Sequence, residues 1–287
     1  MMLGMSVQAI YMLIDTAFIG KWVGNNALAG LGLIFPPMFI IMGITFGLGS
    51  GATTVIAQEI GKGKKQLADN AAEHTIILGI ILSIMFIFIG IFLGDSLIKY
   101  QSEDLDVYNQ ASSYFYTMLY GIPFMVLSIF FRSILSGEGD TLLPMKVLGL
   151  GTLINLLLDP LLIYYFQIKG AAIATVTSQA IVFVIFSYLM IFKKRTYISL
   201  NLKNFIYDFN IFNKILKLGL PASMSMVIMS IGLFFYNSIL GMSEYSTNAI
   251  AAYSTAHRIE HLFFIPIISL ATSMVTLIGM FYGAKKF

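Results

Sequence analysis

The chain has 287 residues, of which 58% are hydrophobic and 11% charged, whereas soluble domains carry about 25% charged residues. With so few charges a soluble fold could not cover this apolar surface, so the composition predicts an integral membrane protein. Cysteine is absent, which excludes disulfides, thiolate metal sites and cysteine nucleophiles. The net charge of +3 is too small to favour nucleic acid as a partner.

Eight apolar segments follow one another along the chain, and each is long enough for a helix that spans a bilayer, which needs about 20 residues. In chain order they are 1–20, 27–57, 71–94, 109–136, 141–166, 170–192, 213–241 and 247–280. The second contains Pro36 and Pro37, which remove backbone donors and kink a helix. Neighbouring helices can satisfy the carbonyls that prolines free. We therefore expect an all-α, multi-pass membrane protein.

The charges in the connecting loops predict the orientation of these helices, because positive residues concentrate on the cytoplasmic side. With the N-terminus inside, thirteen Lys and Arg residues fall in cytoplasmic segments. Only Lys21, Lys99 and Lys169 fall outside, and Arg258 lies within a helix. A chance gathering of lysines in short loops is the alternative. We expect a cytoplasmic N-terminus in the cell (plasma or inner) membrane, since a wrong helix count would scramble this split.

An internal repeat appears when the chain is shifted on itself by 222 residues. Without a gap, Asn26 then meets Asn248 and Asp15 meets Asn237; shared apolar composition is the alternative explanation. The repeat unit has six helices, so both copies have the same orientation, related by an axis along the membrane normal. This predicts a six-helix lobe in 1–192 (TM1–6), a cytoplasmic linker in 193–212 and a second lobe that starts in 213–287. Only two helices of that second lobe (TM7–8) are present, so we expect a partial chain.

The aspartates Asp15 and Asp159 lie inside predicted spans, where an ionisable group is costly and is a functional candidate. At 1.5 Å per residue, Asp15 lies about 8 Å and Asp159 about 15 Å from the outer end of its helix. Asn155 shares a helix face with Asp159. Oxygen ligands suit a hard cation, and a buried carboxylate can instead hold a proton. In the alternative, Asp15 faces the headgroups and Asp159 makes a structural hydrogen bond.

The last predicted span carries His257, Arg258 and Glu260 near its middle. Together with Tyr11 they are candidates for the lining of a substrate cavity, and structural pairing is the alternative. His257 and His261 are spaced to share a helix face, but no further ligand is visible, so no transition-metal site is predicted. No Ser-His-Asp or zinc-protease spacing appears, so we expect neither an enzyme nor an organic cofactor.

Six segments together resemble the MATE (multidrug and toxic compound extrusion) family, and their order and spacing cover essentially the whole chain. They are LIDTAFIG, IAQEIGKGKK, RSILSGEGDTLLPM, INLLLDPLLIY, KGAAIATVTS and LIGMFYGAKKF. In the last of them Met280 replaces an expected glutamine. The resemblance implies twelve helices in two six-helix lobes, of which this chain contains the first lobe and the start of the second. It also implies export of cationic, often aromatic compounds in exchange for Na⁺ or H⁺.

The resemblance implies roles for particular residues of the first lobe. The helix-one aspartate of the family matches Asp15, its helix-five pair matches Asn155 and Asp159, and its helix-six threonine matches Thr175, with Thr177 as the alternative. These residues would couple the cation or proton, and Asp15, Asn155 and Asp159 would form the only metal site, for Na⁺. The helix-four asparagine of the family has no counterpart, although Ser128 would supply an oxygen there. The helix-seven acid of some subgroups is also missing.

The sequence therefore favours a secondary active transporter, a monomer in the lipid bilayer that exports small organic cations. The nearest rival function is a flippase for lipid-linked precursors, which would line its cavity with several positive charges. A channel or a non-transporting membrane scaffold is a rival of a different class, and ion-driven flux against a gradient would exclude a channel.

Overall fold

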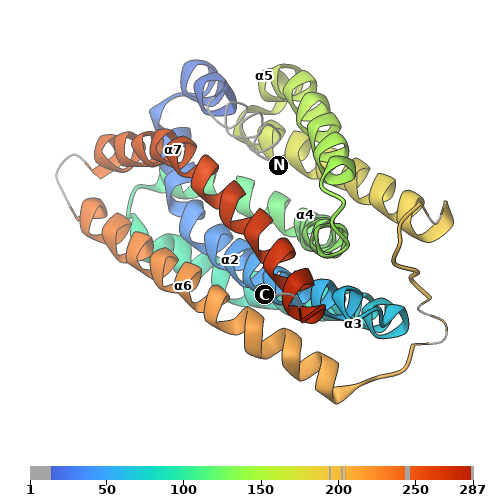
Figure 1. The fold of residues 1–287 in the computed structure, drawn as a ribbon. Helices are drawn as coiled ribbons and strands as arrows, with labels where there is room; N and C mark the ends of the chain where they lie inside the picture. The colour runs from blue at the N-terminus through green and yellow to red at the C-terminus, as the bar shows by residue number, and fades with distance from the viewer. Residues whose placement is uncertain (1–13, 194, 202, 204, 243–245, 286–287) are drawn as a thin grey trace.

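The computed structural model describes every residue except 1–13, 194, 202, 204, 243–245 and 286–287, and throughout the described chain the regular structure is helical. The described elements, in chain order, are a helix at 14–22, α2 (Asn25–Gly61), α3 (Lys65–Gln101), α4 (Leu105–Gly137), α5 (Leu142–Ser187), the π-helical turn η1 (Tyr188–Phe192), α6 (Phe209–Gly241) and α7 (Ser246–Gly283). They run side by side as a bundle (Figure 1). The predicted all-α fold is confirmed.

Five of the described helical segments are long and apolar enough to cross a membrane: α2, α3, α4, α6 and Leu142–Phe192. The last one has 51 residues and is two spans in one, because α5 bends sharply at Gln167, where φ is 52° and ψ is −136°. This bend separates the two segments expected at 141–166 and 170–192. The segment expected at 247–280 lies within α7, whose described apolar part is Leu270–Gly283.

Several helices extend beyond the apolar segments that predicted them. α3 begins at Lys65 rather than at residue 71, and α6 begins at Phe209 rather than at residue 213. The Asp208 side chain accepts hydrogen bonds from the first free backbone N–H groups of α6, which is the usual role of a helix cap. Hydrophobicity does not detect such polar end turns, so the last four residues of the linker expected at 193–212 form the first turn of α6.

Helix α2 is the common partner of the other helices, since α3, α4, α6 and α7 all pack against it. Its Gly47 and Gly51 lie so close to α6 that a Cβ at either position would overlap the backbone of Ser223 or Gly219. Small residues allow this approach in membrane bundles. The contact joins the first half of the chain to the second.

The contact between α2 and α7 is reciprocal near one end of the bundle. Gly61 lies against the backbone of Met280, and Gly283 lies against the backbone of Gln58. A shift of 222 residues turns Gly61 into Gly283 and Gln58 into Met280. The two contacts are therefore related as in a twofold interface, which is the arrangement that parallel repeat lobes require.

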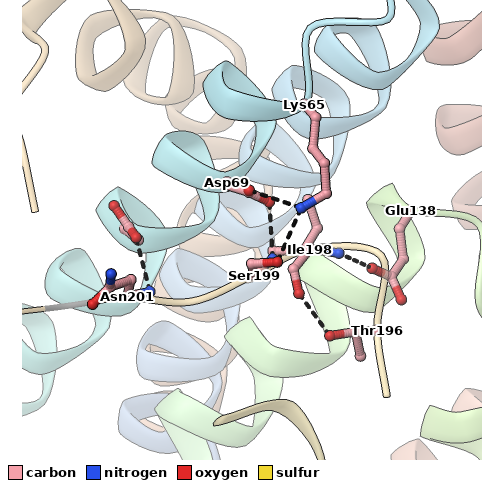
Figure 2. A network of polar contacts seen from close by, with 8 residues as sticks. Lys65, Asp69, Glu138, Thr196, Ile198, Ser199 and Asn201 are labelled. Atoms are coloured by element: carbon pink, nitrogen blue, oxygen red, sulfur yellow. Dashed lines mark hydrogen bonds and ion pairs between the residues drawn. The ribbon is translucent and has the colours of Figure 1, made fainter. Parts of the chain in front are cut away.

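A segment that we call the linker strap, residues 196–208, connects η1 to α6 along one end of the bundle (Figure 1). Three of its backbone N–H groups donate to carboxylates of α3 and of the turn after α4, as Figure 2 shows. The pairs are Ile198 with Glu138 at 3.0 Å, Ser199 with Asp69 at 2.9 Å and Asn201 with Glu73 at 2.9 Å. Charged acceptors make such bonds stronger than neutral ones, so the strap is held to the first half of the chain.

The linker strap packs against the start of α3. Beside the two carboxylates, the Asn70 amide donates to the Ile206 carbonyl at 2.7 Å, and the His74 Nε2 atom accepts from the Asp208 N–H at 3.0 Å. These side chains follow one another at helical spacing on one face of α3. Their contacts explain why α3 remains helical before its apolar segment begins.

Glu138 is the acceptor in this network whose ionisation responds near neutral pH. Burial raises the pKa of the Glu138 carboxyl to about 7, and the nearby carboxylates of Asp140 and Asp69 act in the same direction. The hydrogen bond from Ile198 partly offsets this rise. A raised pKa means that the folded protein binds this proton more tightly than the unfolded chain, so the stability that the protonated carboxyl contributes is lost as pH rises from about 4.5 to about 7.

We therefore predict that Glu138→Gln, which mimics the protonated carboxyl, raises the unfolding temperature at pH 8 and has little effect at pH 5. The rise at pH 8 should be a few degrees, about what 1 kcal/mol gives in a chain of this size, and thermal unfolding in detergent measures it. Glu103→Gln, at the other end of the bundle, is the control. Equal unfolding temperatures in all three proteins at both pH values would show that burial of Glu138 does not oppose its ionisation.

Candidate functional site

Asn155 and Asp159 form a deeply buried polar pair on α5, within the first predicted lobe (1–192). Asp159 is completely buried and Asn155 is 4% exposed. The Asn155 amide donates to the Asp159 carboxylate, with an Nδ2–Oδ1 distance of 3.3 Å. Pro160 follows directly and removes the N–H that would pair with the Leu156 carbonyl. A carboxylate, an amide and a freed carbonyl are thus available within one turn of the helix.

The sharp bend at Gln167 returns the chain beside this pair. Immediately after the bend, Gly170 lies directly on the Leu162 carbonyl, where a Cβ would not fit. The two arms of α5 are therefore in contact from the bend onward.

Further from the bend, Gly151 on the first arm lies against Val182 on the second. The contact of Gly170 with Leu162 near the bend and that of Gly151 with Val182 further away define the antiparallel register of the two arms. In this register Thr175, which is half-buried, lies within one helical turn of the level of Asp159. The structure thus brings the predicted threonine to the level of the Asn155–Asp159 pair. Thr177 is exposed.

Asp15 lies on the helix 14–22 and is buried, with 8% of its surface exposed. One turn later Ile19 joins a buried cluster that also contains Ile163, which follows Asp159 by one turn. We call this the roof cluster; its members are Ile19, Ala27, Leu31, Ile163, Ile168 and Ala171. Residues four apart share a helix face, so both acids lie below the same apolar cluster. Tyr114 of α4 packs against it.

The arrangement provides oxygen donors in an apolar setting. Among the residues that the structure describes, no three His, Asp or Glu side chains gather as a metal site. The acids beneath the roof cluster would therefore bind a hard cation with the help of the Asn155 oxygen, backbone carbonyls or water. Alternatively, each carboxylate would take up a proton.

The second predicted group lies on α7 and is only partly covered by the described residues. His257 is buried, and its Nδ1 atom is 3.3 Å from the carboxylate of Glu260, whose side chain is 61% exposed. The His257 ring also makes an edge contact with Phe35 of α2 at 5.4 Å. Tyr11 and the Arg258 side chain lie outside the described part of the chain.

The two predicted groups lie on different faces of α2. Ala27 and Leu31 belong to the roof cluster above the acids. Gly32 and Pro36 line a small cleft that also includes His257. The contacts of these residues do not bring the histidine and the two acids into one site, and α2 separates them.

The sequence did not identify two polar residues at this cleft as candidates. Asn237 of α6 lines it and Gln101, the last residue of α3, lies beside it, where both side chains are almost fully buried. The signal that would have found them is the pair Pro36–Pro37, since two missing N–H groups leave two carbonyls that need donors from elsewhere.

Comparison with known proteins assigns the chain to a family. The family model MatE matches residues 1–161 and 221–287. The probable multidrug resistance protein YoeA of Bacillus subtilis is 26% identical over an alignment of 289 residues. The alignment covers 98% of this chain and 62% of the relative. The FAD transporter of Shewanella oneidensis is 29% identical over 96% of this chain and 62% of its own length.

A solved structure is similar over the whole chain. It is described as the outward-facing conformation of a multidrug resistance MATE family transporter of the MOP superfamily, with a TM-score of 0.91 and 35% identity. The match covers 100% of this chain and 63% of that one. The chain therefore spans somewhat less than two thirds of the length of the proteins it matches.

The antiparallel register within α5 gives a prediction about stability. Gly170→Ala places a methyl group on the Leu162 carbonyl and should destabilise the protein by about 2 kcal/mol or more, as overpacking does. Gly149→Ala, on the same helix, meets open space and should stabilise it by about 0.5 to 1 kcal/mol through helix propensity. Thermal unfolding in detergent measures both. Equal effects would contradict the tight contact at Gly170.

Proposed function

The chain belongs to the MatE family, and from that premise we propose that it is part of a secondary transporter which exports cationic or aromatic drugs and metabolites. Export would be driven by exchange for Na⁺ or H⁺. Members of this family are transporters rather than enzymes. The name of the Bacillus relative and the description of the similar structure, both of multidrug resistance proteins, support export of small organic compounds.

The observation that carries the proposal is the buried Asp159, with Asn155 bonded to it and Asp15 below the same roof cluster. Buried carboxylates are costly in an apolar bundle and mark the path of an ion or a substrate. An exchangeable cation or proton would reduce that cost. Thr175, at the level of the pair, would supply a further oxygen.

The proposed mechanism is alternating access. When Asp15 and Asp159 are charged, a cationic substrate or the coupling ion is favoured in the cavity. Binding of Na⁺ or H⁺ neutralises the acids, changes the preferred position of the first helix and releases the substrate outward. The ion drives this cycle only if it binds one conformation more tightly than the other.

The arrangement in the membrane is also a proposal. With the N-terminus cytoplasmic, the strap end of the bundle faces the cytoplasm, where its lysines follow the positive-inside rule. Residues 1–192 would form the first lobe, 193–212 the linker and 213–287 the start of a second lobe that packs through α6 and α7 on α2. The protein would act as a monomer in the cell membrane, with His257, Arg258, Glu260 and Tyr11 lining the substrate cavity.

A second candidate function is export of an anionic flavin nucleotide. The observation that favours it is the similarity to a protein named an FAD transporter. A pyrophosphate would need positive side chains in the cavity, as would the lipid-linked precursor of a flippase. The buried acids of the first half favour a cation over both.

We predict that a drug-sensitive host expressing the gene extrudes a cationic dye and that Asp159→Asn or Asp15→Asn lowers the efflux rate. The expected loss is about tenfold or more, the factor that corresponds to about 1.4 kcal/mol of lost ion binding. Asp95→Asn is the matched control, because Asp95 is a partly exposed acid whose carboxylate pairs with Lys99 at 2.7 Å. Its variant should transport like the wild type.

Imposed gradients in inverted vesicles identify the coupling ion, since only the gradient of the coupling ion should drive dye movement. Efflux that is unchanged in Asp159→Asn would remove Asp159 from the mechanism. Extrusion of FAD without extrusion of any cationic dye would favour the second candidate function.

A further inference from the structure

The two prolines of α2 leave two backbone carbonyls without their helical partners. Pro36 lacks the N–H that would bond the Gly32 carbonyl, and Pro37 lacks the one that would bond the Leu33 carbonyl. Both carbonyls lie in the buried part of α2. In an apolar bundle an unpaired carbonyl is costly, so both need donors from other helices.

Two side-chain amides supply these donors, one from each half of the chain. The Asn237 Nδ2 atom of α6 donates to the Gly32 carbonyl at 2.8 Å, and the Gln101 Nε2 atom of α3 donates to the Leu33 carbonyl at 3.0 Å. The Asn237 amide also donates to the Gln101 Oε1 atom at 3.4 Å. We call this pair of side chains the amide clamp. Asn237 is 3% exposed and Gln101 is 1% exposed.

The clamp connects the proline turn of α2, residues 32–37, to the position of α6. If α6 moved away from α2, the Gly32 carbonyl would lose its donor and could not regain one within its own helix. A second bond in the same region, from Ser230 Oγ of α6 to the Pro36 carbonyl at 2.6 Å, adds to this dependence.

The proline turn of α2 adjoins the candidate ion site. Leu31, the residue before Gly32, is a member of the roof cluster with Ile19 and Ile163. Any change of direction at Gly32 therefore moves a side chain that covers the turns of Asp15 and Asp159.

We propose that the amide clamp is a positioning device for transport: Asn237 and Gln101 hold the proline turn of α2 in register with α6 and, through Leu31, hold the roof cluster over the two carboxylates. The effect on transport rests on the proposed function. The existence of the clamp does not, and the two are tested separately.

A double-mutant cycle tests the clamp itself, because Asn237 is needed only while Pro36 lacks its N–H. Asn237→Ala should lower the unfolding temperature by a few degrees, about what 1 kcal/mol gives in a chain of this size. In the background Pro36→Ala, which restores the backbone donor, the same change should have much less effect. Gln101→Ala with Pro37→Ala forms a second, independent cycle if one variant fails to fold. Equal shifts in both backgrounds of both cycles would overturn the proposal.

A cross-linking readout follows position rather than stability. The chain has no cysteine, so Asn25→Cys with Asn248→Cys adds a single reporter pair at the end of the α2–α7 contact, where the native side chains are 3.3 Å apart. Asn237→Ala should slow disulfide formation severalfold, and adding Pro36→Ala should restore it. Ser225→Ala is the control, since its hydroxyl bonds within its own helix. An unchanged rate in Asn237→Ala would contradict the positioning role.

Efflux measurements then connect the clamp to transport. Loss of efflux in Asn237→Ala and its recovery with Pro36→Ala would support the whole proposal. An intact cycle in stability and cross-linking, in a protein whose wild type transports no dye, would keep the clamp and reject the proposed function. Normal efflux in Asn237→Ala would remove the clamp from transport.

Discussion

Backbone polar groups inside an apolar bundle must find their partners within the protein, and this constraint accounts for the amide contacts of α2. Because Pro36 and Pro37 lack N–H groups, amides of α3 and α6 donate to the carbonyls that they free. The linker strap lies outside the predicted spans, and there carboxylates accept backbone N–H groups. In both places a side chain from a distant segment bonds to a backbone group without a helical partner, so each contact also joins two parts of the fold.

Much of the fold could be predicted from the sequence because bilayer-length apolar segments are a strong signal. The eight segments correspond to described helices, apart from residues 1–13, and Asp15 and Asp159 were recognisable as ionisable residues in such segments. The polar first turns of α3 could not be predicted, because their helix depends on the strap that lies on them. Gln101 was missed for a similar reason: it is a polar residue at a helix end, and its bond to the Leu33 carbonyl depends on the distant Pro37. A break between residues 166 and 170 was predicted from the two apolar segments, but the positive φ of Gln167 was not, because glutamine does not favour that conformation.

Helix α2 is central because neighbouring residues on it contact two different candidate sites. Leu31 belongs to the roof cluster over the acids, and Gly32 accepts a hydrogen bond from Asn237 of α6 and borders the cleft with His257. A packed core has discrete arrangements rather than a continuous range of them. A change on one face of such a helix therefore reaches the other face through one peptide unit. No chain of intermediate residues is required.

The internal repeat makes the comparison of Asp15 with Asn237 instructive, since a shift of 222 residues places them at equivalent positions. An ionised carboxylate only accepts hydrogen bonds, whereas an amide also donates. The asparagine lies opposite α2, where Pro36 has freed a carbonyl that needs a donor. The residue of α7 at the position equivalent to Pro36 is Arg258, which keeps its backbone N–H. The two copies of the expected repeat therefore differ at both positions of the Pro36–Asn237 pair. The amide accompanies the proline that frees a carbonyl, whereas the carboxylate of Asp15 accompanies a residue with an ordinary backbone donor and stays available for the proposed ion site.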